Sequence, residues 1–158
     1  MTIPMQDIVD ALVSHAQLTG YFEKVSTSEP KSPPATGLTC AAWAQALAPH
    51  APSSGLAATS AYLVMQLRLY DNMLRSTVDE ADRIDPRMLE ATDALMASYT
   101  GEFTLASLVM AIDLLGMGGE SLRAEAGYVQ IGGPGSGMYR IMTITIPMII
   151  SDAWTQVA

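Results

Sequence analysis

The stretch YLVMQLRLY at residues 62–70 contains the clearest strand pattern in the chain and decides the fold. Leucine or methionine at positions 63, 65, 67 and 69 alternates with a mixed set of side chains at the positions between them. A period of two places successive side chains on opposite faces, as in a half-buried strand. We therefore expect a β-strand here, with the other elements arranged around it.

Three elements are predicted before this strand. Apolar residues recur at helical spacing after Pro4, and Gly20 suits a helix end, so a helix is expected over about residues 4–19. Residues 21–28 fit a first strand. Residues 38–48 are rich in alanine, which favours a helix, but they also fit one face of a strand, and strand is our preferred interpretation.

Two connections on this side lack regular structure. Three prolines between residues 30 and 34 remove backbone donors, so an extended, projecting arm is expected at about residues 28–37. A turn rich in proline, serine and glycine is expected at residues 49–55.

On the C-terminal side, Asp85-Pro86 resembles an N-cap followed by proline at the first helical position, and Gly101 suits the end of that helix. Residues 103–115 fit either a helix or a strand. Residues 122–131 and 138–151 flank the glycine-rich segment 132–137, which predicts two final strands joined as a hairpin.

These elements predict the fold class. A helix, three strands, a second helix and two strands form an α+β domain with a mainly antiparallel or mixed sheet of about five strands packed with two helices. With 158 residues, the chain is long enough for one core, and a single domain over residues 1–158 is expected.

Composition limits the possible partners. Hydrophobic residues make up 49% of the chain and charged residues 15%, and some of this apolar excess is expected in subunit contacts. The net charge is −8 and the arginines are scattered, which argues against stable binding of nucleic acid. The longest apolar run, residues 141–150, is short and interrupted by polar residues and proline, so no membrane span is expected.

The search for chemistry finds no catalytic, cofactor-binding or metal-binding motif. The glycines of residues 132–137 do not have the spacing of a dinucleotide-binding loop. The residues around Ser136 do not match the motif of a nucleophile elbow. Cys40 could form a catalytic pair of thiol and base with His15 or His50. We prefer the alternative interpretation, in which the cysteine is buried and the histidine lies on the surface. An acidic cluster at residues 79–85 does not match a calcium loop, and we interpret it as a solvated loop rather than a weak cation site.

Several short segments resemble one protein family. The segments are Tyr139–Pro147, Ile149–Trp154, Ile112–Gly116 and Gly127–Val129. Together with the order of the elements, they are similar to tail terminator (tail completion) proteins of long-tailed bacteriophages, of the lambda type and its actinobacterial-phage relatives. The resemblance covers most of the chain as a pattern of elements and short apolar motifs, although the proline-rich arm and the alanine-rich strand depart from it.

This resemblance implies a structural virion protein and not an enzyme. The subunits would form a ring, expected to be a hexamer, that caps the tail tube at the head–tail junction, ends tube growth and offers a surface for head attachment. The implied partners are other copies of the chain, the major tail tube protein and a head-completion or connector protein, while DNA passes through without specific binding. The subunit would be in the host cytoplasm during assembly, and no cofactor is implied. Alternatives are a head-completion or tail-tube subunit, or a small-ligand-binding protein or enzyme.

Two groups of residues are candidate contact sites in such a ring. Contact with the tube or with a neighbouring subunit is expected from five residues of the arm: Glu29, Pro30, Lys31, Pro33 and Pro34. An acidic lumen or rim is expected from four residues of the acidic cluster: Asp79, Glu80, Asp82 and Asp85.

Because no motif makes them catalysts, we expect single alanine substitutions of His15, Cys40, His50 and Ser136 to leave function intact. Complementation of phage infectivity by each variant measures this. Loss of infectivity by any one variant that is folded and soluble would support the enzyme alternative.

Overall fold

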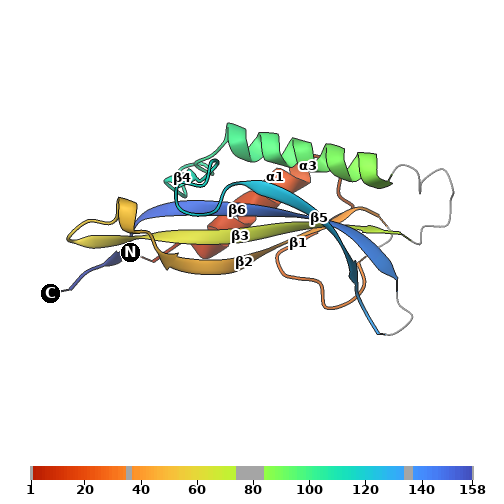
Figure 1. Ribbon diagram of the computed structural model, residues 1–158, viewed down its shortest axis with the longest axis horizontal. Helices are drawn as coiled ribbons and strands as arrows, with labels where there is room; N and C mark the ends of the chain where they lie inside the picture. The colour runs from red at the N-terminus through yellow and green to blue at the C-terminus, as the bar shows by residue number, and fades with distance from the viewer. Residues whose placement is uncertain (1, 35–36, 74–83, 134–136, 158) are drawn as a thin grey trace.

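In the part of the chain that the structure describes, two helices lie on one side of a mixed, curled sheet of six strands (Figure 1). The computed structural model describes residues 2–34, 37–73, 84–133 and 137–157. In chain order the elements are α1 (Met5–Leu18), β1 (Lys24–Ser26), β2 (Thr39–Pro49), the 3-10 turn η1 (Ala51–Ser53), β3 (Ala58–Asn72), α3 (Ile84–Gly101), β4 (Ala111–Ile112), β5 (Arg123–Gln130) and β6 (Met138–Thr155). The predicted α+β fold class is confirmed.

The sheet is organised by two long antiparallel strands, β3 and β6. Residues 61–72 of β3 lie opposite residues 150–139 of β6 without interruption. The strand order is β1-β2-β3-β6-β4, and β5 also pairs with β6, along a different part of the same edge as β4. The strand predicted at residues 62–70 is therefore central in the sheet.

The main core lies between this sheet and the helices. Leu63, Met65, Leu67 and Leu69 are fully buried on the helix side of β3. Burying each such side chain contributes about 1.5–3 kcal/mol relative to leaving it exposed. The prediction of a half-buried strand understates the burial of β3. On its other face, Tyr62, Val64 and Tyr70 are buried as well.

Both helices agree with their predicted ranges to within about two residues. In α1, the apolar stripe Ile8, Leu12, Val13 and Ala16 is buried against the sheet and α3. The helix ends just before Gly20, whose φ of +73° is a left-handed conformation that glycine adopts without strain. The Tyr99 hydroxyl of α3 donates a hydrogen bond of 3.0 Å to the Leu12 carbonyl, which joins the two helices.

The segment before β3 differs in detail from its prediction. The alanine-rich segment forms strand β2, as we preferred, whereas the predicted strand at residues 21–28 is only the three-residue β1. Because β1 and β2 are parallel, the chain must cross back between them, and the proline-rich arm makes this connection. Figure 1 shows this orange loop on the side of the sheet away from the helices.

Residues 103–115, where helix and strand both remained open, are mostly turns followed by the two-residue strand β4. Leu105, Ala106 and Ser107 have φ values of 46°, 54° and 67°. Side chains of L-residues crowd the backbone in this left-handed region, so neither helix nor strand could continue through it. The short pairing of β4 with β6 accounts for the sixth strand.

No helix in the described part of the chain is long and apolar enough to cross a membrane.

The backbone strain of the left-handed residues 105–107 can be relieved by a substitution, and the effect on stability can be measured. We expect the Ala106→Gly variant to be more stable than the wild type by roughly 1 kcal/mol, because glycine removes the steric cost of the left-handed conformation at an exposed position. Ala97→Gly, at an exposed position within α3, is the matched control and should destabilise by about 1 kcal/mol. Chemical denaturation measures both, and destabilisation by both glycines to the same extent would contradict the left-handed turn.

Candidate interaction surfaces

The five predicted arm residues lie together in the crossover between β1 and β2, and Glu29 and Pro34 of the described part of this loop contact the sheet. Glu29 lies 3.7 Å from Arg68 of β3, and the Tyr139 hydroxyl donates a hydrogen bond of 3.2 Å to the Pro34 carbonyl. Arg68 in turn stacks on Trp43 and donates to the Thr143 hydroxyl. The arm is thus attached to the helix-free face of the sheet, and contact with a neighbour or the tube stays a prediction.

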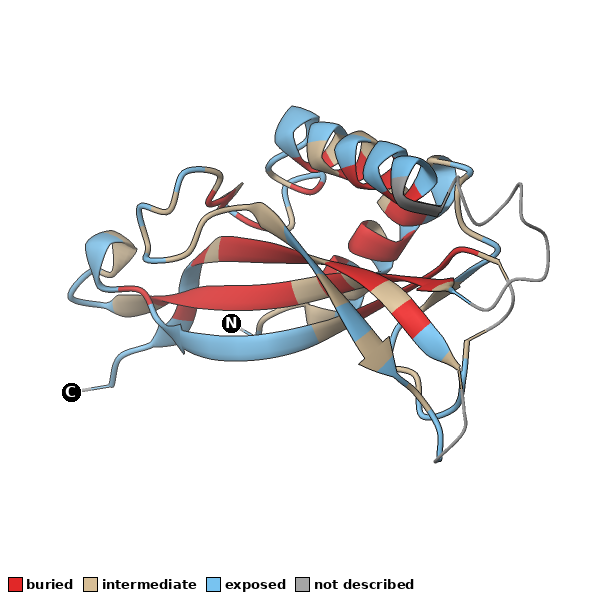
Figure 2. Cartoon of the chain, turned by 45° about the vertical axis from the view of Figure 1, so that its right-hand side comes forward, coloured by how far each residue is buried: buried red, intermediate tan, exposed pale blue. Residues whose placement is uncertain are grey.

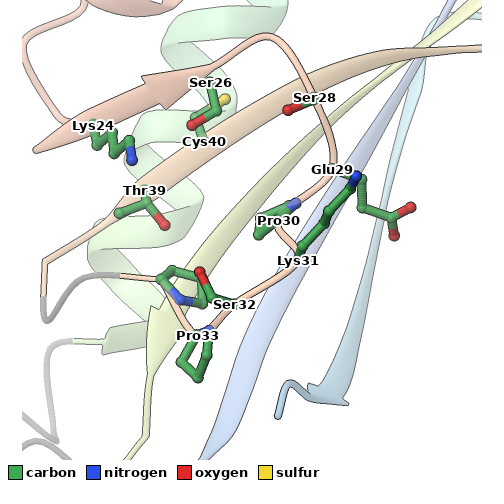
Figure 3. A pocket seen from close by; sticks show the side chains of 11 residues that line it. Lys24, Ser26, Ser28, Glu29, Pro30, Lys31, Ser32, Pro33, Thr39 and Cys40 are labelled. Atoms are coloured by element: carbon green, nitrogen blue, oxygen red, sulfur yellow. The ribbon is translucent and has the colours of Figure 1, made fainter.

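The arm encloses a hollow of about 340 Å³ (Figure 3). Both lysines of the chain, Lys24 and Lys31, line it together with several hydroxyl groups. Figure 3 shows the two ammonium groups at opposite sides of the hollow, so their charges do not converge on one point. The Thr39 hydroxyl, which also lines the hollow, is buried and has no hydrogen-bond partner among the described residues. We find no arrangement here that selects a particular ligand.

Most of the acidic cluster lies outside the described residues. Asp79, Glu80 and Asp82 lie outside the described residues. Asp85 lies in the first turn of α3, which begins at Ile84, one residue before the predicted cap. In the described part of the chain, no group of three or more His, Cys, Asp and Glu residues could hold a metal ion.

Cys40 and the two histidines are in separate environments. Cys40 is buried in the core near the start of β2, and burial raises the pKa of its thiol far above the usual range. His15 Nδ1 lies 2.6 Å from the Ser98 hydroxyl, and its Nε2 lies 3.2 Å from Glu102. His50 lies beyond the other end of β2, beside Ser53 and stacked on Tyr62. Each histidine has its own local partners, so the geometry does not bring a thiol and a base together; Ser136 lies outside the described residues.

A surface that the motif search missed is the second half of β2. Every residue from Ala44 to Pro49 is exposed, although all of them except Gln45 are apolar. The largest of these side chains, Leu47, is 48% exposed. Figure 2 shows this stretch in pale blue along the lower edge of the sheet, beside the red β3. Within the described residues, β1 pairs with β2 only at Thr39–Ala41. The outer edge of β2 is therefore open over most of its length.

A second missed surface is the loop after β4. Backbone N–H groups of Gly116, Met117 and Gly118 donate hydrogen bonds of 2.9, 2.9 and 2.6 Å to the buried Asp113 carboxylate. The Tyr62 hydroxyl lies 3.1 Å from the same carboxylate. These contacts fix a loop whose Leu115 and Met117 side chains are 89% and 90% exposed.

The surroundings of the Asp113 carboxylate favour its ionised form. Burial by itself would raise the pKa of Asp113, but the hydrogen bonds from the Gly118 and Met117 amides, the Tyr62 hydroxyl and the Gly116 amide outweigh it and lower the pKa. Aspartate at the start of a tight turn would have been a usable signal in the sequence, since its side chain commonly binds following backbone amides.

Compared with known protein families and with curated protein sequences, the chain matches none.

The Asp113 loop makes a testable contribution to stability. Asp113→Asn keeps the shape but replaces an acceptor oxygen by an amide donor that faces backbone N–H groups. We expect a loss of about 1–3 kcal/mol in unfolding free energy at pH 7, and faster amide exchange in the loop. Asp93→Asn, on the exposed surface of α3, is the control and should change stability by less than about 0.5 kcal/mol.

The dependence on pH follows from the direction of the shift. A carboxyl whose pKa is lower in the folded protein contributes stability above its unfolded pKa, and this contribution is lost as pH falls through the folded pKa. The difference between wild type and Asp113→Asn should therefore shrink below about pH 4, near the unfolded pKa of aspartate. A constant difference from pH 7 to pH 2 would contradict this assignment.

Proposed function

We propose that the chain is a structural subunit of a ring that caps the tail tube of a long-tailed bacteriophage, ends tube growth and offers a surface for head attachment. The observation that carries the assembly role is the exposed, apolar stretch Ala44–Pro49 on an open sheet edge. Monomeric proteins usually protect such edges, because unpaired backbone groups beside apolar side chains readily bind another chain.

The assignment to the tail comes from the sequence resemblance, and the fold gives the resembling segments a common location. Tyr139–Trp154 lies within β6, Gly127–Val129 lies in β5 and pairs with residues 141–139, and Ile112 of β4 pairs with Met148. Segments that are far apart in the sequence thus meet along one strand. This common location along β6 is the structural context of the resemblance on which the proposal rests.

The acidity of the chain is compatible with this role. A net charge of −8 on each copy gives a ring that repels nucleic acid, so a genome could pass without adhering. The partners in this proposal are other copies of the chain, the major tail tube protein below and a head-completion or connector protein above.

Growth of tubes in the presence of the subunit tests the proposal. Tail tube protein of the same phage, polymerised with an excess of this chain, should give shorter tubes than tube protein alone, each with added density at one end in electron micrographs. The chain alone should form rings and not tubes. Unchanged tube lengths without end density would contradict the capping role, and long tubes formed by the chain alone would identify a tube subunit.

A further inference from the structure

The open edge of β2 also lacks charge. No Asp, Glu, Lys or Arg occurs between Lys31 and Arg68, a span that includes all of β2, η1 and the start of β3. The whole chain has a net charge of −8, so two copies repel each other over most of their surfaces. An uncharged edge is where identical acidic copies can approach with the least electrostatic cost.

The usual protections of a sheet edge are sparse in this stretch. Natural edge strands carry lysines, inward-pointing charges, prolines or bulges that prevent pairing. Between Trp43 and Pro49 there is one register shift, between Ala44 and Ala46, and the proline stands at the end.

The edge is held in position before any partner binds. The turn after β2 is joined to β3, because the Ser60 hydroxyl donates to the Ser53 carbonyl (2.8 Å) and the Ser60 amide donates to the Ser54 hydroxyl (3.0 Å). The His50 amide donates to the Ser60 carbonyl, and the His50 ring stacks on Tyr62. A preorganised edge loses little conformational entropy when a strand is added.

The opposite edge of the same sheet offers a complementary strand. Among the described residues, β5 pairs only with β6, so its outer side is open over Arg123–Val129. Its charges are balanced locally, since Arg123 lies 3.7 Å from Glu120 and 3.5 Å from Glu125. An uncharged strand can therefore pair with it without leaving a charge unpartnered.

From these observations we infer that residues 43–49 of β2 pair with the outer edge of β5 in a second copy of the chain, so that the sheet continues from subunit to subunit. Pairing two different edges is heterologous, and such a contact gives a ring of more than two copies where the rotation from copy to copy closes. The inference rests on the proposed function for the closed ring, but the contact itself can be tested separately.

Charge placed on the edge should abolish the contact. Ala46→Lys with Leu47→Lys introduces lysine at two exposed neighbouring positions, and we expect the wild-type oligomer to be replaced by monomer in sedimentation velocity. The matched control, Gln17→Lys with Leu18→Lys, adds the same charge at exposed positions at the end of α1 and should assemble as the wild type does. Circular dichroism verifies that both variants are folded.

Cross-linking identifies the partner edge. A short bismaleimide should join an Ala46→Cys copy to an Ala126→Cys copy, because these exposed positions lie on β2 and β5, and it should not join either variant to itself. The native Cys40 is buried and serves as an unreactive background. Efficient linking of Ala46→Cys to itself would overturn the inference in favour of a two-fold contact.

Hydrogen exchange gives a readout without substitutions. Amides of residues 43–49 should exchange more slowly at concentrations where the wild type is oligomeric than where it is dilute. Oligomers that persist in the edge variant, without such protection, overturn the β2 contact but leave the capping role intact. A wild type that stays monomeric at all concentrations also overturns the contact, and the tube-length assay then decides the function independently.

Discussion

The antiparallel pairing of β3 with β6 is the interaction on which the rest of the structure depends. It aligns the two longest strands over residues 61–72 and 139–150, and it gives the helices one continuous apolar surface to cover. Because β6 is long, its other edge can accept β5 and then β4 in succession. The loop of Asp113 is placed by the pairing of β4 with β6.

The same architecture leaves part of the molecule uncovered. The first residues of β2 are buried under α1 and beside β1, whereas the strand continues beyond them with both faces and one edge exposed. The many hydrophobic residues of the chain thus lie in two places. Most form the core between sheet and helices, and others form the exposed apolar surface of β2, which water solvates poorly. A surface of the second kind is expected of a subunit whose stable form is an assembly.

The sequence was sufficient for the fold class because residues 62–70 and the first helix have clear hydrophobic periods, while Asp85-Pro86, Gly101 and the glycine-rich segment 132–137 mark the ends of later elements. The sequence was insufficient where tertiary contacts determine the secondary structure. β4 is only two residues long, and the three-residue β1 is defined by its pairing with β2. The left-handed residues 105–107 have no sequence signal, since none is glycine or asparagine. Among the candidate sites, the arm residues do lie together, while three of the four acidic residues lie outside the described part of the chain.

The exposed edge was missed for a physical reason. The residue pattern of an alanine-rich strand is the same whether the strand is buried between two neighbours or lies at an open edge. Only the arrangement of the other strands distinguishes these cases. The absence of charge from Lys31 to Arg68 was the available signal. The most direct test of the account is a cryo-electron microscopy reconstruction of the protein bound to the end of a tail tube. We predict a closed ring in which β2 of each copy continues the sheet of its neighbour; a ring whose copies meet through other surfaces, or no ring at the tube end, would contradict it.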